Sequence, residues 1–166
     1  MILNTARLLI RPPVMEDMET SFAIWMDPKV TQFSGGPARE EQVRKGFLAD
    51  LALRDSDYGF RTVIETASGL HIGDCGLLKK EIESKAEIEL VYFFHSNFWG
   101  KGYATEAAQA LFTHAFAKLA LKRLVSLIHP ENTASKSVAM KVGMMFERNV
   151  VTAKGNLREM FSKNCP

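Results

Sequence analysis

The residues most indicative of a binding site form a short glycine-containing segment, Trp99 to Ala107, with the sequence Trp-Gly-Lys-Gly-Tyr-Ala-Thr-Glu-Ala. It lies between a β-rich run, Glu87 to Phe94, and an alanine-rich amphipathic run, Ala107 to Leu119. A strand, a glycine turn and a helix start in this order can bind an anion. Glycine lets the backbone approach a ligand, and the helix N-terminus offers unpaired N–H groups and a positive dipole end, worth about 0.3–1 kcal/mol to a nearby charge. The segment therefore predicts a phosphate-binding site.

The turn differs from two common phosphate-binding loops. It has no Gly-Lys-Ser/Thr sequence, so it is not a P-loop. Gly100 and Gly102 are followed at the third position by Thr105, where the dinucleotide-binding fingerprint has a third glycine. Taken by itself, the turn is also compatible with an ordinary glycine turn between a strand and a helix.

Two carboxylates precede the turn and are candidates for proton transfer. Glu87 and Glu89 alternate with apolar Ile88 and Leu90, so both side chains point to one face of the expected strand. Two neighbouring carboxylates raise the pKa of at least one of them, as a general base requires. The same alternation is typical of a half-exposed strand, which leaves a structural role open. His95, just after the strand, is a further candidate base or a surface group.

The elements that position these residues follow from the hydrophobic periodicity. A charged turn is expected at Lys79 to Lys85. Consecutive strands in the middle of the chain favour antiparallel pairing, whereas the strand–helix–strand unit at 87–128 requires a parallel pair with a right-handed crossover. We therefore expect one domain, residues 1–166, of the mixed α/β (α+β) class, with a mostly antiparallel sheet of about seven strands and four helices on both faces. The expected strands are 7–11, 60–65, 71–78, 87–94, 123–128, 145–152 and 157–162, and the expected helices are 14–26, 39–53, 107–119 and 133–142.

Composition limits the classes of partner and compartment. A chain of 166 residues with 46% hydrophobic content can bury one core. A formal charge of +2, with dispersed Lys and Arg, gives no reason to expect nucleic acid. Cys75 and Cys165 are far apart and form no metal-binding spacing, which favours a reduced, cytoplasmic setting and no metal. The sequence contains no signal peptide and no apolar run near ~18 residues, so we expect no membrane span.

The glycine segment resembles the acyl-CoA loop of the GNAT N-acetyltransferases, usually written Gln/Arg-x-x-Gly-x-Gly/Ala. Trp99 replaces the first residue of that pattern, as in the ribosomal-protein N-acetyltransferase branch, where W-G-x-G-Y-A-T-E-A is a familiar form. The opening run Thr5 to Pro12 and the run Asn132 to Met144, similar to N-x-x-S-x-x-V-A-x-K-x-G-F, resemble the same branch. The expected element order is also that of the GNAT fold, and the resemblance covers nearly the whole chain.

This resemblance implies an enzyme that transfers an acetyl group from acetyl-CoA to a primary amine by direct attack in a ternary complex. The acceptor is a protein N-terminal α-amine or a small-molecule amine, and the loops Gln32 to Arg39 and Ala153 to Leu157 are expected to shape its entrance. A monomer and a homodimer both remain open. The resemblance also implies a set of contacts to coenzyme A, through the loop backbone, the strand edge before it, and the start of the last helix. These residues are Phe93, Phe94, His95, Trp99, Gly100, Lys101, Gly102, Tyr103, Ala104, Thr105, Asn132, Ser135 and Lys136.

The resemblance also implies two catalytic roles. Glu89 matches the Glu of the family's E-I-G-Y strand pattern and is expected to be the general base. Ser135 is expected to donate a proton to the leaving thiolate, since Ala139 stands where many members carry a tyrosine. Asn132 also suits a helix N-cap, worth about 1 kcal/mol. Because a complete acid/base pair is not evident, the alternative is a non-catalytic acyl-CoA-binding sensor or interaction module.

Overall fold

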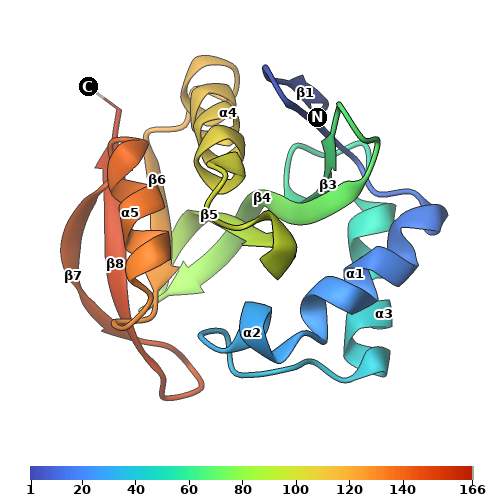
Figure 1. Ribbon diagram of the computed structural model, residues 1–166. Helices are drawn as coiled ribbons and strands as arrows, with labels where there is room; N and C mark the ends of the chain where they lie inside the picture. Colours follow the sequence, from blue (N-terminus) through green and yellow to red (C-terminus); the bar gives the residue numbers. More distant parts are fainter. Residues whose placement is uncertain (166) are drawn as a thin grey trace.

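In a computed structural model, which describes residues 1–165, eight strands form one sheet in the order β1-β2-β3-β4-β5-β6-β8-β7 (Figure 1). Every neighbouring pair is antiparallel except β5 and β6, which are parallel. The strands are β1 (Leu3–Asn4), β2 (Leu8–Arg11), β3 (Gly59–Glu65), β4 (His71–Ile82), β5 (Lys85–Phe94), β6 (Arg123–Ile128), β7 (Met145–Val151) and β8 (Leu157–Asn164).

The helices cover both faces of the sheet. Successive side chains of a strand point to opposite faces, and on β5 the ring of Phe93 contacts Trp25 of α1, while Phe94 belongs to the core beneath α4. The helices α1 and α3 pack against each other on the first face, and α4 and α5 lie together on the second. The helices are α1 (Met18–Trp25), α2 (Pro28–Thr31), α3 (Glu40–Ala52), α4 (Tyr103–Ala117) and α5 (Thr133–Lys141), with 3₁₀ turns at Met15–Asp17 and Ser96–Phe98.

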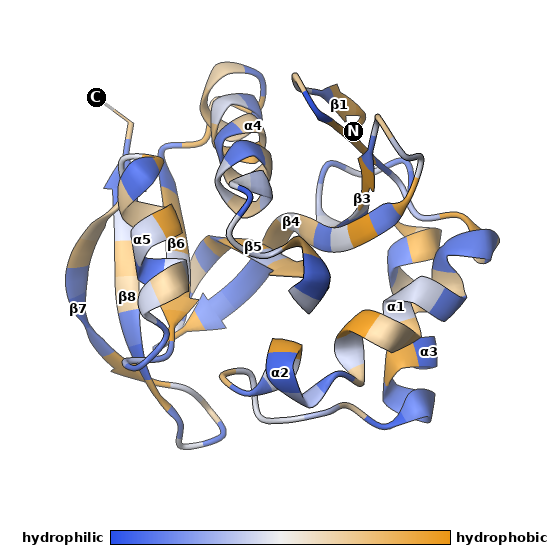
Figure 2. Cartoon of the chain, viewed as in Figure 1, coloured by the Kyte–Doolittle hydropathy of each residue, from blue (hydrophilic) through white to orange (hydrophobic). Residues whose placement is uncertain are grey.

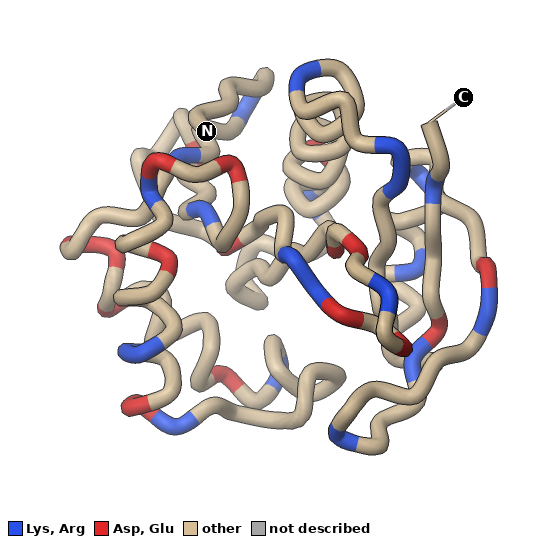
Figure 3. The backbone as a smooth tube through the Cα atoms, turned by 180° about the vertical axis from the view of Figure 1, so that it is seen from behind, with Lys and Arg blue, Asp and Glu red and all other residues tan. Residues whose placement is uncertain are grey.

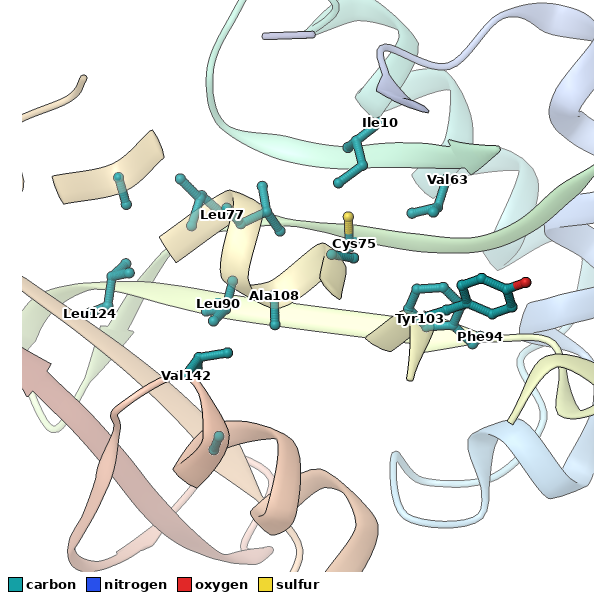
Figure 4. Close-up of a cluster of buried hydrophobic side chains, with 14 of the residues drawn as sticks. Ile10, Val63, Cys75, Leu77, Leu90, Phe94, Tyr103, Ala108, Leu124 and Val142 are labelled. Atoms are coloured by element: carbon teal, nitrogen blue, oxygen red, sulfur yellow. The ribbon is translucent and has the colours of Figure 1, made fainter. Parts of the chain in front are cut away.

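The main core lies between the sheet and α4 (Figure 4). Ala107, Ala108 and Leu111 of α4 are fully buried there, and the two small alanines let the helix backbone come close to Cys75 and Leu90 of the sheet. Figure 2 shows hydrophobic and hydrophilic residues alternating around the helices, as expected where one side of each helix packs against the sheet. This packing fixes the start of α4, and with it the glycine segment, relative to β5.

The expected fold class is confirmed, and the element boundaries show where sequence patterns misplace an end. The charged turn expected at Lys79 to Lys85 is wrong: β4 and β5 continue through it, and only Glu83 and Ser84 turn, both with positive φ. The strands continue because Ile82 is buried against a second apolar cluster on β6, β7 and β8. The helix expected from Ala107 begins earlier, at Tyr103.

Basic and acidic residues are interspersed along the chain in the view from behind (Figure 3). Among residues 1–165, no helix combines the length and the apolar character that crossing a membrane would require.

Candidate active site

The glycine segment forms a tight turn that leads directly into α4. Gly100 and Gly102 have φ of 74° and 84°, a left-handed conformation that other residues rarely adopt. A Cβ at Gly100 would meet nothing within 4 Å, so the space beside this turn is open. The expected pyrophosphate-binding residues Tyr103, Ala104 and Thr105 form the first turn of α4, where backbone N–H groups have no partner within the helix. The arrangement is that of an anion-binding helix start.

Contacts from the turn between β1 and β2 hold the glycine segment in place. The guanidinium of Arg7 donates to the carbonyl of Lys101 at 3.0 Å and to the carboxylate of Glu106 at 2.7 Å, and it lies 4.5 Å from the centre of the Tyr103 ring. Glu106 also accepts a hydrogen bond from the hydroxyl of Thr5. Arg7 and Glu106 were not singled out from the sequence, because nothing in the pattern tells which residues the turn between β1 and β2 brings to α4.

The base of the turn is held by Trp99, as its Nε1 donates to the carbonyl of Phe94 at 2.7 Å. One of the carbonyls expected to pair with the pantetheine arm is therefore already occupied. His95 caps the following 3₁₀ turn by accepting from the N–H of Asn97, and the ammonium of Lys101 lies over the ring of Phe98. The expected contacts of Phe93, Phe94 and His95 with coenzyme A stay predictions.

The parallel strands β5 and β6 separate almost as soon as they meet. Their ladder contains one pair, Glu89 opposite Val125. Two side chains then satisfy backbone groups that a continued ladder would have paired: the hydroxyl of Ser126 donates to the carbonyl of Leu90 at 2.7 Å, and the carboxylate of Glu89 accepts from the N–H of Leu127 at 3.3 Å. The backbone ladder between β5 and β6 therefore ends at Glu89, and we call the place where the two strands part the β5–β6 gap, with Glu89 at its apex.

Glu89 has the environment of a carboxyl group that can take up a proton. Glu89 is only 8% exposed, and burial raises the pKa of its carboxyl group above the usual range. Lys80 at 3.9 Å, the N–H of Leu127 and Arg158 act in the opposite direction and lower this pKa. Glu87 shares the strand face, but its carboxylate is paired with Arg123 at 3.1 Å. The two glutamates therefore differ, and only Glu89 lies at the β5–β6 gap.

The start of α5 closes the other side of this gap. The side chain of Asn132 accepts from the N–H of Ser135 at 3.1 Å, so Asn132 is the N-cap of α5. The hydroxyl of Tyr92 on β5 reaches across and donates to the carbonyl of Ser135 at 3.0 Å. Tyr92 thus lies beside the expected proton donor. The ammonium of Lys136 lies 2.7 Å from Glu159, and its expected phosphate contact stays a prediction.

The two loops expected at the acceptor entrance do approach each other. Arg158, next to the loop Ala153 to Leu157, donates to the carbonyl of Phe33 in the loop Gln32 to Arg39 at 3.1 Å. This contact joins β8 to the segment between α2 and α3, on the face of the sheet that carries Glu89. The two loops expected at the acceptor entrance therefore meet on the face of the sheet opposite α4.

Comparisons with known proteins show the family and the fold. Residues 7–145 match the family model of the acetyltransferase (GNAT) domain. The uncharacterized N-acetyltransferase p20 of Bacillus licheniformis is 30% identical over 166 residues, which cover 96% of this chain and 92% of that protein. A crystal structure of an acetyltransferase from Agrobacterium tumefaciens has a TM-score of 0.84 and 28% identity, covering 99% of this chain and 95% of the other.

The fold is also that of RimL, the ribosomal L7/L12 α-N-protein acetyltransferase solved with coenzyme A, with a TM-score of 0.79, 18% identity and coverage of 99% and 98%. Matches to a family model over most of the chain and to relatives over nearly their full length rule out a local likeness of one loop. The chain belongs to the GNAT family of acetyltransferases, whose general reaction is the acetyl-CoA-dependent acetylation of an amine.

Proposed function

We propose that this chain transfers an acetyl group from acetyl-CoA to a primary amine and that Glu89 is the general base of the reaction. The observation that carries the proposal is the buried carboxylate at the apex of the β5–β6 gap. An amine attacks only in its neutral form. At pH 7, deprotonation costs a lysine-like amine of pKa near 10.4 about 4–5 kcal/mol and an α-amine near 7.8 about 1 kcal/mol. A buried carboxylate with a raised pKa can accept that proton.

The chain's own groups account for the other requirements of the reaction. The backbone N–H groups at Gly100 to Thr105 are suited to the pyrophosphate of coenzyme A, and Arg7 keeps them in place. Once Glu89 has taken the proton of the ammonium group, the neutral amine nitrogen forms a bond to the acetyl carbon, the carbon–sulfur bond breaks, and the nitrogen loses its second proton to solvent. The hydroxyl of Ser135 gives a proton to the leaving thiolate and regains one from solvent, and Tyr92 orients the Ser135 backbone through its carbonyl.

The first experiment measures thermal unfolding with and without acetyl-CoA, with NAD as a control ligand. At about 100 times its dissociation constant a ligand adds about 2.7 kcal/mol to the free energy of unfolding, which raises Tm by about 5–11 °C for a domain of this size. We expect a shift with acetyl-CoA alone and its loss in Gly102→Val, because a β-branched residue does not adopt the φ of 84°. No shift at millimolar acetyl-CoA would refute the proposed binding site.

The second experiment is turnover with a panel of amines, followed by release of free coenzyme A. Acetylation of any amine at a rate above that of acetyl-CoA hydrolysis supports the enzyme. Binding of acetyl-CoA without turnover on the whole panel would instead support a non-catalytic acyl-CoA-binding module.

A further inference from the structure

A cavity of about 220 Å³ lies beneath α1 and α3, on the face of the sheet that carries Glu89. The mechanism proposed above uses none of the groups in its wall. The wall combines aromatic rings with carboxylates, and it has a small residue where α3 passes over it. Its principal members are Trp25, Gly46, Phe47, Asp50, Phe60 and Asp74.

The apolar part of this cavity has room for one aromatic ring. Trp25 meets the ring of Phe60 edge-on at 5.1 Å between centroids and the ring of Phe93 at 4.3 Å. Aromatic groups pack favourably in such edge-to-face and tilted surroundings. An apolar cavity of about 150 Å³ holds a benzene molecule, so this one has room for a ring with a short alkyl chain.

The polar end of the cavity has one hydrogen-bond acceptor left over. Both oxygens of Asp74 have partners, Trp25 Nε1 and His71 Nε2, each at 2.9 Å. Asp50 accepts from the N–H of Phe60 at 2.9 Å through Oδ1, and among residues 1–165 its Oδ2 has no hydrogen-bond partner. The free oxygen of Asp50 is therefore available to a donor on a ligand.

The charges of the wall favour a cationic donor. Asp50 and Asp74 are opposed by one cation, Arg61, which is fully buried. The terminal nitrogens of Arg61 donate to backbone carbonyls, among them those of Phe60 and Tyr58, rather than to either carboxylate. Among residues 1–165, Asp74 is paired with His71 at 2.9 Å, whereas Asp50 makes no salt bridge, so Asp50 is the carboxylate that can pair with a cationic ligand.

The cavity also lies at a suitable distance from the reacting centre. Phe60, Gly76 and Val91 are direct neighbours across β3, β4 and β5. Strands lie about 4.8 Å apart, so Phe60 is about 10 Å from Val91. Val91 follows Glu89 by two residues on the same face, at the place where β5 leaves β6. A molecule with one ring and a short chain spans this distance.

We propose that this cavity is the acceptor pocket and that the acceptor is a small arylalkyl amine carrying a second hydrogen-bond donor, preferably an ammonium group, at the far end of its ring. The reacting amine lies near Val91 and Glu89, the ring lies against Trp25 and Phe60, and the second donor binds Asp50. The inference rests on the proposed function, and it selects a small molecule over a protein N-terminus.

The test compares three small amines, phenethylamine, tyramine and p-xylylenediamine, with a short peptide that has an N-terminal alanine. We expect tyramine and the diamine to exceed phenethylamine in kcat/KM by about tenfold, the effect of one charge-assisted hydrogen bond. Asp50→Asn should remove this difference and leave the KM for acetyl-CoA unchanged, because the amide oxygen still accepts from the N–H of Phe60.

A second variant fills the cavity rather than changing its charge. Gly46 lies in α3 without a positive φ, and a Cβ there would meet nothing within 4 Å, so Gly46→Leu places a side chain at the cavity without a clash. We expect the KM for all three small amines to rise at least tenfold. Ala49→Leu, an exposed position of the same helix outside the cavity wall, is the matched control and should change nothing.

Calorimetric titration of the protein with tyramine, without acetyl-CoA, separates this inference from the proposed function. Tyramine binding that both Asp50→Asn and Gly46→Leu weaken supports the pocket, even if no amine is turned over, in which case only the acetyl transfer fails. Turnover of the peptide alone, or tyramine binding that neither variant changes, would overturn the pocket and leave the acetyltransferase intact. For each variant, a Tm equal to that of the wild type, and an equal rise in Tm on addition of acetyl-CoA, verify that the variant is folded.

Discussion

Replacing Glu89 by glutamine tests the proposed base with little disturbance of the fold. The carboxylate accepts from the N–H of Leu127, and the amide oxygen of glutamine can accept the same hydrogen bond. Glu89→Gln therefore removes the base and keeps the β5–β6 gap. Glu89→Ala also leaves the Leu127 N–H without a partner, which costs about 1–3 kcal/mol of stability. The difference between the two variants separates catalysis from structure.

The expected loss of kcat/KM in Glu89→Gln is about 10²–10⁴-fold, the usual contribution of a general base, or about 3–5 kcal/mol. The acceptor sets its dependence on pH. An amine of pKa near 10.4 is neutral in only about one part in 10³ at pH 7, and that fraction rises about tenfold per pH unit. The variant should therefore recover activity steadily towards pH 10, whereas the wild type should level off above the pKa of Glu89.

The pKa of Glu89 also determines whether Glu89→Gln raises or lowers the stability of the folded protein. Burial raises the pKa of Glu89 in the folded protein, so above pH 4.5 the folded state holds this proton more tightly than the unfolded chain. The contribution of Glu89 to stability is complete below pH 4.5 and is lost as the pH rises through the folded value. At pH 7, Glu89→Gln should have a Tm equal to or above that of the wild type. A kcat/KM within threefold of wild type, with an unchanged pH profile, would refute the assignment.

Three further predictions follow from other contacts. Arg7→Met removes the donors to the Lys101 carbonyl and to Glu106, and it should raise the KM for acetyl-CoA about tenfold at constant kcat in steady-state assays; an unchanged KM would contradict this. Burial raises the pKa of Asp50 to about 6 from 3.8, so the contribution of Asp50 to stability is complete below pH 3.8 and is lost as the pH rises through 6. Between pH 4 and pH 7 the Tm of the wild type should therefore fall relative to the Tm of Asp50→Asn. Parallel Tm curves for the two proteins would refute this prediction. Leu111→Ala leaves a cavity in the core and should cost about 3 kcal/mol by urea unfolding, or about 6–12 °C in Tm, and a loss below 1 kcal/mol would mean that the site collapses.

The sequence was sufficient for the fold class because periodicity and turn residues report on each element separately. The two shortest elements, β1 and α2, were not predicted, since two and four residues carry no period. The turn of the β4–β5 hairpin was expected to be too long because its charged residues resemble a turn, while the burial of Ile82 depends on distant strands.

In the candidate site, too, the local features could be predicted from the sequence and the long-range contacts could not. The glycine segment and the Asn132 cap are local, and their geometry follows from adjacent residues. The pairing of Arg7 with Glu106 spans 99 residues, and the Glu89–Leu127 hydrogen bond spans 38. Such contacts depend on strand register and helix placement, which no single-sequence pattern contains.

The two oxygens of Glu89 have different surroundings, and this difference predicts how the pKa of the base can be changed. Oε1 accepts from Leu127, while Oε2 lies 3.9 Å from the ammonium of Lys80, so the incoming proton belongs on Oε2. A nearby cation favours the ionised carboxylate and lowers its pKa. Because Lys80 is 46% exposed, the attraction is close to its value in water, about 1 kcal/mol at 4 Å, or less than one pKa unit. Lys80→Met should therefore move the acidic limb of the kcat/KM profile upward by about half a pH unit. Lys79→Met, at the neighbouring position, is the control and should leave this limb in place. A shift in Lys79→Met and not in Lys80→Met would assign the proton to a group other than Glu89.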